Sequence, residues 1–389
     1  MDKPEEMDEP AKMDKPSETK ALEQRVNLVE QQFAALSDFV EKKLTFEFVN
    51  DATKVLGHKS MKGTHNYNYM GERFRDYELA LLNIKQMGYY IGLNEAYRNG
   101  GFKRMENVIA PVATRLPSKL CTQDDCNSDW YAFWLQEMRS GFVYHRKLWE
   151  FAYIAQSLFA HGFLKEGKRG LGFGCGEEPL ASLFAKYGAA IVATDLDPVS
   201  SQDKGGGWME CGQHADSLAK IQNASVCPDE SKIANISHEF ADMNAIPAHF
   251  NGQFDFCWSA CALEHLGSIE LGLQFIENSM DTLKPGGLAV HTTEFNLEDG
   301  PTIDNTFTVL YQRSHMEQLR TRLKNLGYAV APFNFDGGSG MLDGLFDLPP
   351  WPWDEAKLGW KMQENFAHLK RSIGGFACTS IAIAVMKPA

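Results

Sequence analysis

The sequence lacks the features of membrane-spanning proteins and of secreted, disulfide-rich proteins. Its longest apolar candidate, residues 377–386, is far shorter than the roughly 20 residues that a membrane-spanning helix needs. The acidic N-terminus contains no apolar run of the kind found in signal peptides. The 8 cysteines show no paired CxxC spacing and no accompanying histidine cluster, so no metal ligands are predicted. These absences predict a reduced, cytoplasmic protein without a transmembrane segment.

The sequence is also poor in positive charge. It contains 38 Lys and Arg against 51 Asp and Glu, which gives a formal net charge of -13. General binding to nucleic-acid phosphates requires a basic surface, so no nucleic-acid partner is expected. The 389 residues are 44% hydrophobic and 23% charged. That composition is ordinary for globular proteins, and the chain is long enough for one large domain or two smaller ones.

The first 44 residues differ from the rest of the chain. Within residues 1–20 a Met-Asp-x-Pro unit recurs with almost no apolar content, which predicts a disordered tail. Residues 21–44 predict a helix, because apolar side chains follow one another at intervals of four and three: Leu22, Val26, Val29, Phe33, Leu36 and Val40. Two interpretations remain open. One is a coiled coil that joins copies into a homo-oligomer, and the other is an amphipathic helix that packs on its own domain.

A helical region precedes an α/β region. Residues 45–165 are rich in aromatic side chains and mostly helical in pattern, which predicts a helical extension. From residue 166 to residue 389, strands alternate with helices. Strands are expected at 171–173, 190–194, 254–258, 288–293, 328–335 and 378–386, and helices at 178–187, 271–283 and 315–326. The alternation predicts an α/β fold with a mostly parallel sheet and helices on both faces, interrupted by a Trp- and Pro-rich insertion at about 336–360.

A glycine-rich motif marks the expected ligand-binding edge of this sheet. Residues 172–179 read Gly-Phe-Gly-Cys-Gly-Glu-Glu-Pro and lie between a strand and a helix, where glycines allow a sharp turn and close approach of a ligand. Asp195 ends the next strand and can accept hydrogen bonds from both hydroxyls of a ribose. The GxGxxG pattern of NAD-binding proteins fails in both frames, because Glu177 or Pro179 stands at its third glycine. Glu177 and Glu178 would repel a pyrophosphate and suit a cationic ligand.

Together with later landmarks, residues from about 167 to 295 resemble the class I S-adenosylmethionine (SAM)-dependent methyltransferases. Gly174-Cys175-Gly176 looks like the loop under the methionine part of SAM, and Asp195 looks like the acid that binds its ribose. Asp242-Met243 looks like the pair at the adenine edge after the third strand. Residues 259–266 and 283–287 look like the loop after the fourth strand and the turn into the fifth.

The resemblance implies SAM as the cofactor and a Rossmann-like sheet of seven strands. The cofactor-binding residues that it implies are Gly172, Gly174, Cys175, Gly176, Glu177, Asp195, Leu196, Asp242, Met243 and Ser259. Two positions depart from the family pattern. Gly172 stands where the family usually has an acid, and Glu178 stands where it often has a third glycine. Glu177 or Glu178 could replace the missing acid.

The loops after the fourth and fifth strands are expected to form the acceptor site. His265 and Glu294 are the candidate catalytic residues there, because a hydroxyl acceptor must lose a proton and histidine is a base near neutral pH. A structural role remains open for each, as a pocket-shaping histidine and as a hydrogen-bond acceptor. His291 lies inside the fifth strand and is expected in the core.

We therefore expect an enzyme that moves a methyl group from SAM to a hydroxyl of a small molecule or saccharide. The saccharide part of this expectation rests on the tryptophans of the 336–360 insertion and on the acidic charge. The alternatives are an N- or C-methyltransferase of another small molecule and a non-catalytic, methyltransferase-like scaffold. Such a scaffold would hold partners through residues 22–44.

Overall fold

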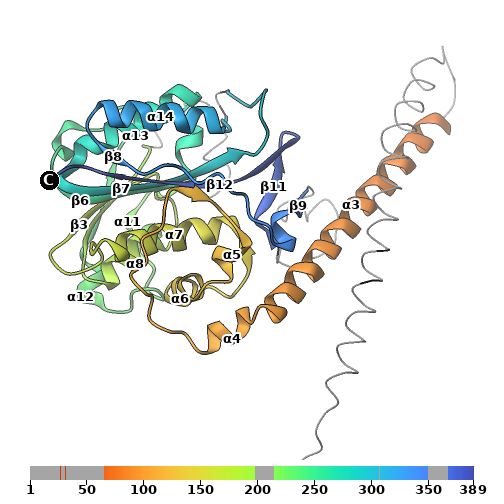
Figure 1. Ribbon diagram of the computed structural model, residues 1–389, viewed down its shortest axis with the longest axis horizontal. Coiled ribbons are helices and arrows are strands. Elements are labelled where there is room, and N and C mark those ends of the chain that lie inside the picture. The colour runs from red at the N-terminus through yellow and green to blue at the C-terminus, as the bar shows by residue number, and fades with distance from the viewer. Residues whose placement is uncertain (1–26, 28–30, 32–64, 198–213, 306, 349–366) are drawn as a thin grey trace, which may run out of the picture. The chain divides into compact units, whose positions relative to one another are not determined.

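The computed structural model describes residues 27, 31, 65–197, 214–305, 307–348 and 367–389. The chain divides into two compact units, residues 1–77 and residues 78–389, and the sheet lies in the second unit (Figure 1). The predicted tail, nearly all of the heptad segment and residues 349–360 of the insertion lie outside the described residues. Every helix within the described ranges is too short or too polar to cross a bilayer.

Among the described residues, a ten-stranded sheet runs in the order β5-β4-β3-β6-β7-β12-β11-β9, and β1 and β8 also pair with β12. Its strands are β1 (Lys119–Leu120), β3 (Arg169–Phe173), β4 (Ala190–Asp195), β5 (Ile236–Phe240), β6 (Phe254–Ala260), β7 (Leu283–Asn296), β8 (Ala329–Val330), β9 (Phe346–Asp347), β11 (Lys370–Ile373) and β12 (Phe376–Met386). The strands β3 to β7 are mutually parallel, and β12 runs antiparallel to β7. The α/β prediction is therefore confirmed. β1, β9 and β11 extend the sheet beyond the seven strands expected.

The outer side of β12 is covered by three short strands rather than by one long one. β11 pairs with its start, at residues 376–378, and β1 pairs with Ile381 and Ala382. β8 pairs with its end, at Val385 and Met386. A separate two-stranded sheet joins β2 (Tyr144–His145) in parallel to β10 (Ala367–His368).

Helices cover both faces of the sheet (Figure 1). The α-helices are α3 (His65–Arg98), α4 (Gly101–Glu106), α5 (Gln123–Cys126), α6 (Asp129–Glu137), α7 (Arg146–Ala160), α8 (Leu180–Lys186), α11 (Leu218–Ile221), α12 (Glu230–Ile233), α13 (Ile269–Ser279) and α14 (Arg313–Asn325). Single 3-10 turns are η2 (Ala248–Phe250), η3 (Leu263–His265), η4 (Met280–Thr282) and η5 (Met341–Asp343).

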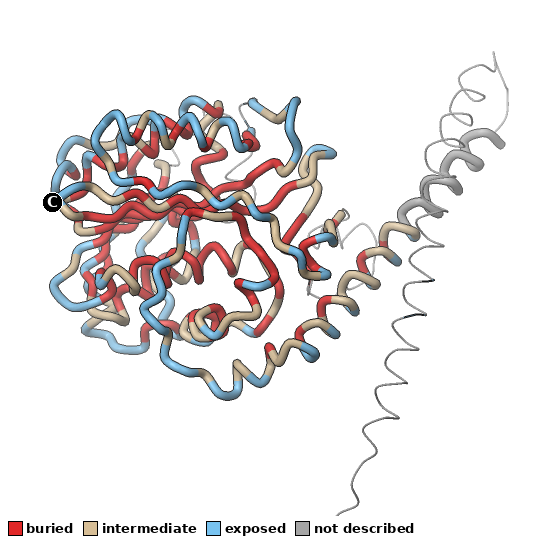
Figure 2. Tube along the Cα trace, in the orientation of Figure 1, coloured by how far each residue is buried: buried red, intermediate tan, exposed pale blue. Residues whose placement is uncertain are grey.

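Successive residues of each strand face opposite layers, and so form two separate cores. Phe256 and Trp258 of β6 pack with the α6, α7 and α8 layer, whereas Cys257 packs with the α13 and α14 layer. Figure 2 shows the sheet as a continuous buried layer between the two. The helix α7 is buried along most of its length and contacts β6, β7 and β12. From residue 78 onward, the predicted helical extension and the α/β segment therefore share one core.

Two predicted boundaries shifted for visible reasons. The strand expected at 288–293 begins at Leu283, because the chain pairs with β6 already before Gly286 and Gly287, with a register irregularity between Phe254 and Phe256. The strand expected at 328–335 is only Ala329–Val330, because the next stretch of the same edge of β12, at Ile381 and Ala382, pairs with β1 instead.

Candidate active site

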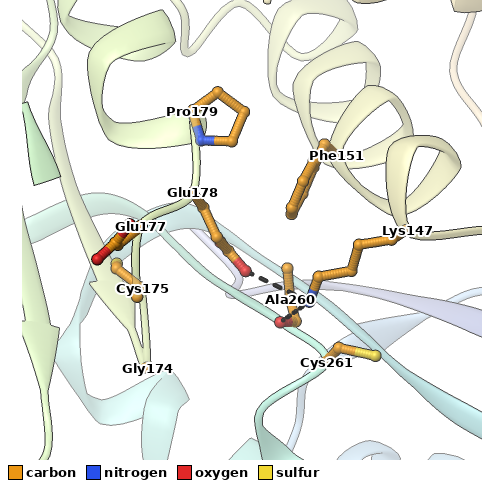
Figure 3. A pocket seen from close by; sticks show the side chains of 10 residues that line it. Lys147, Phe151, Gly174, Cys175, Glu177, Glu178, Pro179, Ala260 and Cys261 are labelled. Carbon is orange, nitrogen blue, oxygen red and sulfur yellow. Dashed lines mark hydrogen bonds and ion pairs between the residues drawn. The ribbon is translucent and has the colours of Figure 1, made fainter. Parts of the chain in front are cut away.

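The glycine-rich loop after β3 borders a cavity of about 260 Å³ (Figure 3). Gly174 and Gly176 have φ angles of 57° and 50°, a left-handed conformation that favours glycine. A Cβ at Gly174 would also lie 2.8 Å from the Cβ of Ala262. The cavity is lined by Lys147, Phe151, Gly174, Cys175, Gly176, Glu177, Glu178, Pro179, Ala260 and Cys261. It therefore lies at the carboxyl ends of β3 and β6, where ligands of parallel sheets bind.

Gly172 does not line this cavity. A Cβ at this position would lie 2.3 Å from the Sγ of Cys175 and 2.4 Å from the Cζ2 of Trp258. The acid that the family usually has here therefore has no room in this chain. A carboxylate is instead supplied by Glu178, two residues before helix α8 begins.

Asp195 lies beside the glycine loop, as predicted, and is only 3% exposed. Its Oδ2 accepts hydrogen bonds from the backbone N–H groups of Gly176 (3.2 Å) and Ala215 (3.1 Å). Its Oδ1 accepts one from Leu196 N–H at 2.8 Å. The Leu196 carbonyl is 2.7 Å from the Nε2 of His214. These contacts fix the carboxylate at the loop. Oδ2 already accepts two hydrogen bonds, so Oδ1 is the oxygen that retains a lone pair for a ligand hydroxyl.

The two residues of the predicted adenine-edge pair, Asp242 and Met243, have different surroundings. Met243 is buried, and its Sδ would lie 3.4 Å from a Cβ at Gly174, which places it against the glycine loop. Asp242 accepts a hydrogen bond from Asn244 N–H at 2.8 Å. Both residues follow the end of β5, at the same edge of the sheet as Asp195.

Ser259 points away from the cavity, into the opposite layer. Its Oγ lies 2.8 Å from the Nδ1 of His291, whose Nε2 lies 3.1 Å from the Oγ of Ser279. Burial lowers the pKa of His291 to about 3, so this histidine is a neutral core residue. The next two residues, Ala260 and Cys261, line the cavity in place of Ser259.

A charged pair crosses the cavity between α7 and the glycine loop. In Figure 3 the side chains of Lys147 and Glu178 point toward one another, and their Nζ and Oε1 atoms lie 3.5 Å apart. Lys147 also donates a hydrogen bond to the Ala260 carbonyl at 3.0 Å. Burial raises the pKa of Glu178 to about 8, against the opposing effect of Lys147. The Oε2 of Glu178 is buried and has no hydrogen-bond partner among the described residues.

Behind this pair lies a buried network around Glu150 of α7. Arg146 donates to the Oε1 of Glu150 at 3.1 Å, and Ser380 donates to the same oxygen. Thr292 donates to the Oε2 of Glu150 at 3.2 Å. The network ties α7 to the facing strands β7 and β12 and so holds Lys147 over the cavity.

Glu294, a predicted catalytic residue, belongs to this network. It accepts a hydrogen bond from the Nη2 of Arg146, and the Nη1 of Arg371 lies 3.9 Å from its Oε1. Burial disfavours its charged form, but Arg146 and Arg371 outweigh burial and hold the pKa of Glu294 below its ordinary value. An ionised carboxylate held by an arginine is a weak base, so the geometry favours a positioning role.

His265, the other predicted catalytic residue, lies in η3 after the loop that lines the cavity. Its Nδ1 lies 2.8 Å from the carbonyl oxygen of Phe307. Because a carbonyl can only accept, Nδ1 carries the proton in the neutral ring, and Nε2 carries the lone pair. The adjacent Glu264 is fully buried, and burial raises the pKa of its carboxyl.

Sequence reasoning missed the contribution of α7 to the site. Arg146, Lys147 and Glu150 were assigned to the helical extension, and no strand or motif connects them to the glycine loop. A signal was present, because these are the only charged side chains in the otherwise apolar and aromatic segment 146–160. Charged residues in a helix that is otherwise buried are retained for pairing or for a site.

Comparisons with known proteins agree with this geometry. Residues 145–334, just under half of the chain, match the family model described as "Methyltransferase domain". This stretch of the chain is a SAM-dependent methyltransferase domain. The match begins at the start of α7, so this methyltransferase domain includes the helix that carries Lys147. A search of curated proteins gave no match.

Solved structures of methyltransferases show distant likeness. A protein described as a candidate sarcosine dimethylglycine methyltransferase from Galdieria sulphuraria is 17% identical, with 67% of this chain and 99% of that chain covered and a TM-score of 0.39. A SAM-dependent methyltransferase from Mesorhizobium loti is 15% identical, with 61% and 98% covered and a TM-score of 0.35. Phosphoethanolamine N-methyltransferase 2 from Haemonchus contortus is 15% identical, with 60% and 51% covered and a TM-score of 0.34. At these TM-scores the likenesses carry no argument about the substrate.

The residues of the methyltransferase cavity fit its cofactor, SAM. The buried Oε2 of Glu178, which has no partner among the described residues, would accept from the ammonium group of the methionine part, and Lys147 would balance the carboxylate of that part. Gly174 and Gly176 line the cavity without a Cβ, and their positive φ angles turn the loop backbone there. No phosphate site is needed, in keeping with two glutamates in the loop.

Proposed function

We propose that this methyltransferase moves the methyl group of SAM to a hydroxyl of a small molecule, with saccharides among the acceptors. The observation that carries the proposal is the hydrogen bond from His265 to the Phe307 carbonyl, 2.8 Å long, which leaves Nε2 of the neutral ring as a proton acceptor. An amine acceptor that is already neutral needs no such base, whereas a hydroxyl does. His265 lies in η3, which follows the cavity-lining residues Ala260 and Cys261 along the chain.

SAM supplies a methyl group on a sulfonium, which a nucleophile displaces directly. The protein's task is then to align the acceptor, exclude water and accept one proton. Glu178 and Lys147 hold the amino-acid end of the cofactor, and Asp195 holds its ribose. His265 takes the hydroxyl proton at Nε2. Glu294 and Glu150, fixed by Arg146, position α7 and the loop around Cys261.

The test is His265→Ala in the full-length protein, assayed with labelled SAM against a panel of hydroxyl-bearing small molecules and sugars. We expect kcat to fall by about 10²–10⁴ with SAM affinity unchanged, and added imidazole to restore part of the rate. His249→Gln is the matched control, because His249 is exposed and its Nε2 lies 3.0 Å from a carboxylate oxygen of Glu239. Full activity of His265→Ala would refute the base. Loss of SAM binding would indicate a structural role.

A second candidate is methyl transfer to an amine, and one observation favours it. The carboxylates of Glu178, Glu264 and Glu294 gather beside the cavity, and such a set would attract a protonated amine. The same panel should therefore contain primary and tertiary amines. A methylated amine as the main product, formed equally well without His265, would select this candidate over the first.

Two further proposals rest on sequence. Residues 22–44 would join copies of the chain as a coiled coil, and deletion of residues 1–44 should then reduce the oligomer mass in light scattering. An unaltered mass would contradict this. A cytoplasmic location is supported by the seven cysteines within the described ranges, which are all free and buried. The Trp351, Trp353 and Trp360 that favour a saccharide lie outside the described residues.

A further inference from the structure

A buried group of possible metal ligands lies beside the cofactor cavity, and the proposed methyl transfer does not use all of its atoms. The Sγ of Cys261, a carboxylate oxygen of Glu264 and one of Glu294 lie within 4.8 Å of one another, and all three residues are buried. Cys261 directly follows β6, Glu264 belongs to η3, and Glu294 belongs to β7. Neighbouring strands of the sheet therefore bring the three side chains to one edge.

Each of the three side chains is oriented by a second residue. Thr293 donates to the Oε2 of Glu264 at 3.1 Å. Arg146 donates to Glu294 through Nη2 and to the Sγ of Cys261 through Nη1, the latter at 3.3 Å. Hydrogen bonds of this kind orient the ligands in protein metal sites. The Cys261 thiol also donates to the Oε1 of Glu150 at 3.4 Å, so metal binding would displace the thiol proton, whereas Glu264 and Glu294 each have a second carboxylate oxygen for a ligand.

One of these remaining atoms is a buried acceptor without a hydrogen bond among the described residues. Glu264 is fully buried, and its Oε1 has no hydrogen-bond partner among the described residues. A buried carboxylate oxygen without a partner is strongly disfavoured unless something else satisfies it. Because Oε2 of Glu264 accepts the hydrogen bond from Thr293, Oε1 is the oxygen that remains for a ligand.

The backbone at Cys261 supports a role for its thiol. Its φ is 53°, a left-handed conformation that is rare outside glycine. Strained residues of this kind persist where the surroundings hold them, often at functional sites. Here the conformation keeps the thiol between the cofactor cavity, which Cys261 lines, and the two carboxylates.

We propose that Cys261, Glu264 and Glu294 bind a divalent transition-metal ion, best zinc, beside the SAM cavity. One thiolate with two carboxylates suits borderline zinc better than magnesium or calcium, which take oxygen ligands alone. Ligand atoms around tetrahedral zinc lie about 3.3–3.8 Å apart, so a closure of about 1 Å by side-chain rotation is needed. The three negative ligands are balanced by the ion together with Arg146.

Three protein ligands are the number typical of catalytic zinc sites, in which a fourth position takes water or substrate. This inference rests on the proposed function in one respect: the fourth ligand would be the acceptor hydroxyl. Zinc in that position would make the acceptor hydroxyl easier to deprotonate.

The first experiment measures zinc binding to the full-length protein after removal of metal with a chelator, by competition with a chromogenic indicator. We expect one zinc ion per chain. Cobalt(II) should replace it and give a near-ultraviolet band from thiolate-to-metal charge transfer. Glu264→Gln should weaken zinc binding by about 10–100-fold or more, as loss of a direct ligand exceeds the loss of a residue behind it.

Cys261→Ser should abolish the charge-transfer band, whereas Cys227→Ser should keep it. Cys227 is the matched control because it is also buried, and its Sγ donates to the Asp229 carbonyl in the loop before α12. If Cys261→Ser does not fold, as judged by circular dichroism, the wild-type cobalt spectrum and Glu264→Gln decide. Wild-type protein that binds no zinc, or a band that persists without Cys261, overturns the proposal.

SAM calorimetry on the metal-free protein separates this inference from the proposed function. If the metal-free chain binds SAM and methylates a hydroxyl acceptor at the full rate, the metal site fails and the methyl transfer stands. If zinc binds with the expected ligands but no hydroxyl acceptor is methylated, the site stands and the choice of acceptor fails.

Discussion

The position of Gly172 allows a stability prediction that depends on two distances. The substitution Gly172→Ala adds one methyl group in β3, at a site where the ideal Cβ lies 2.3 Å from the Sγ of Cys175 and 2.4 Å from the Cζ2 of Trp258. Carbon atoms in contact prefer about 3.5–4.0 Å, so both neighbours must move by about 1 Å. Trp258 is fully buried, and Cys175 is held in the glycine loop. Neither can move freely.

Overpacking of this kind destabilises by about 1–3 kcal/mol, and urea unfolding followed by fluorescence measures it. Gly141→Ala is the control, because nothing lies within 4 Å of its ideal Cβ and its φ is not positive. It should change stability by less than about 0.5 kcal/mol. Because Cys175 must shift, Gly172→Ala should also weaken SAM binding, which Gly141→Ala should not do.

A double-mutant cycle tests the cause. Trp258→Phe removes the outer ring of the indole, so on this background Gly172→Ala should cost less, with a coupling of about 0.5–3 kcal/mol. The reasoning is refuted if Gly172→Ala and Gly141→Ala have equal effects, or if the cost of the methyl group is the same beside tryptophan and beside phenylalanine.

Four further predictions concern charged and titratable groups. SAM binding should tighten as pH rises through about 8, because Glu178 must ionise to bind an ammonium group. In calorimetry the affinity of Glu178→Gln for SAM should depend less on pH, and a pH dependence identical to that of the wild type would contradict the assignment. Asp195→Ala should weaken SAM binding at least about tenfold, since a ligand's hydroxyls lose a charged acceptor, and unchanged affinity would remove Asp195 from the ribose site. The folded-state pKa of His291, about 3, lies below its ordinary value of 6.5, so the unfolded chain binds a proton at His291 at a higher pH than the folded chain does. The contribution of His291 to stability should therefore be lost as pH falls from about 6.5 toward 3. Denaturation curves of His291→Gln should depend less on pH in this window. A fourth concerns Asp347, which pairs with Lys85 at 2.8 Å and with His368 at 2.6 Å; Asp347→Asn should destabilise by about 3–5 kcal/mol in urea unfolding, whereas Glu317→Gln, at an exposed pair, should have almost no effect.

The order of elements in the α/β segment could be predicted from the sequence because strong local signals mark each one. The apolar run at 190–194, the helix stop at Gly188 and the Asp195 that follows all leave periodic or compositional traces. The glycine loop and Asp195 were brought together as expected, since parallel neighbours β3 and β4 end at the same edge.

The remaining features depend on long-range packing that no local pattern records. Ser259 and Cys261 both belong to the motif at the end of β6, which the sequence reveals. Only the register of β6 against β7 shows that Ser259 faces His291 and that Cys261 lines the cavity. The pairing of Arg146 with Glu294 joins residues 148 positions apart. β1 is only two residues long, too short for any periodic signal to predict its place beside β12.

The piecewise cover of β12 has a practical consequence for anyone who shortens this protein. A fragment trimmed to begin at residue 145, where the family match starts, would lack β1. The backbone of Ile381 and Ala382 would then be an open, apolar strand edge, which invites pairing with another chain. We expect such a fragment to aggregate, although every residue of its cofactor cavity would be present, whereas one that begins before Ser118 should remain dispersed.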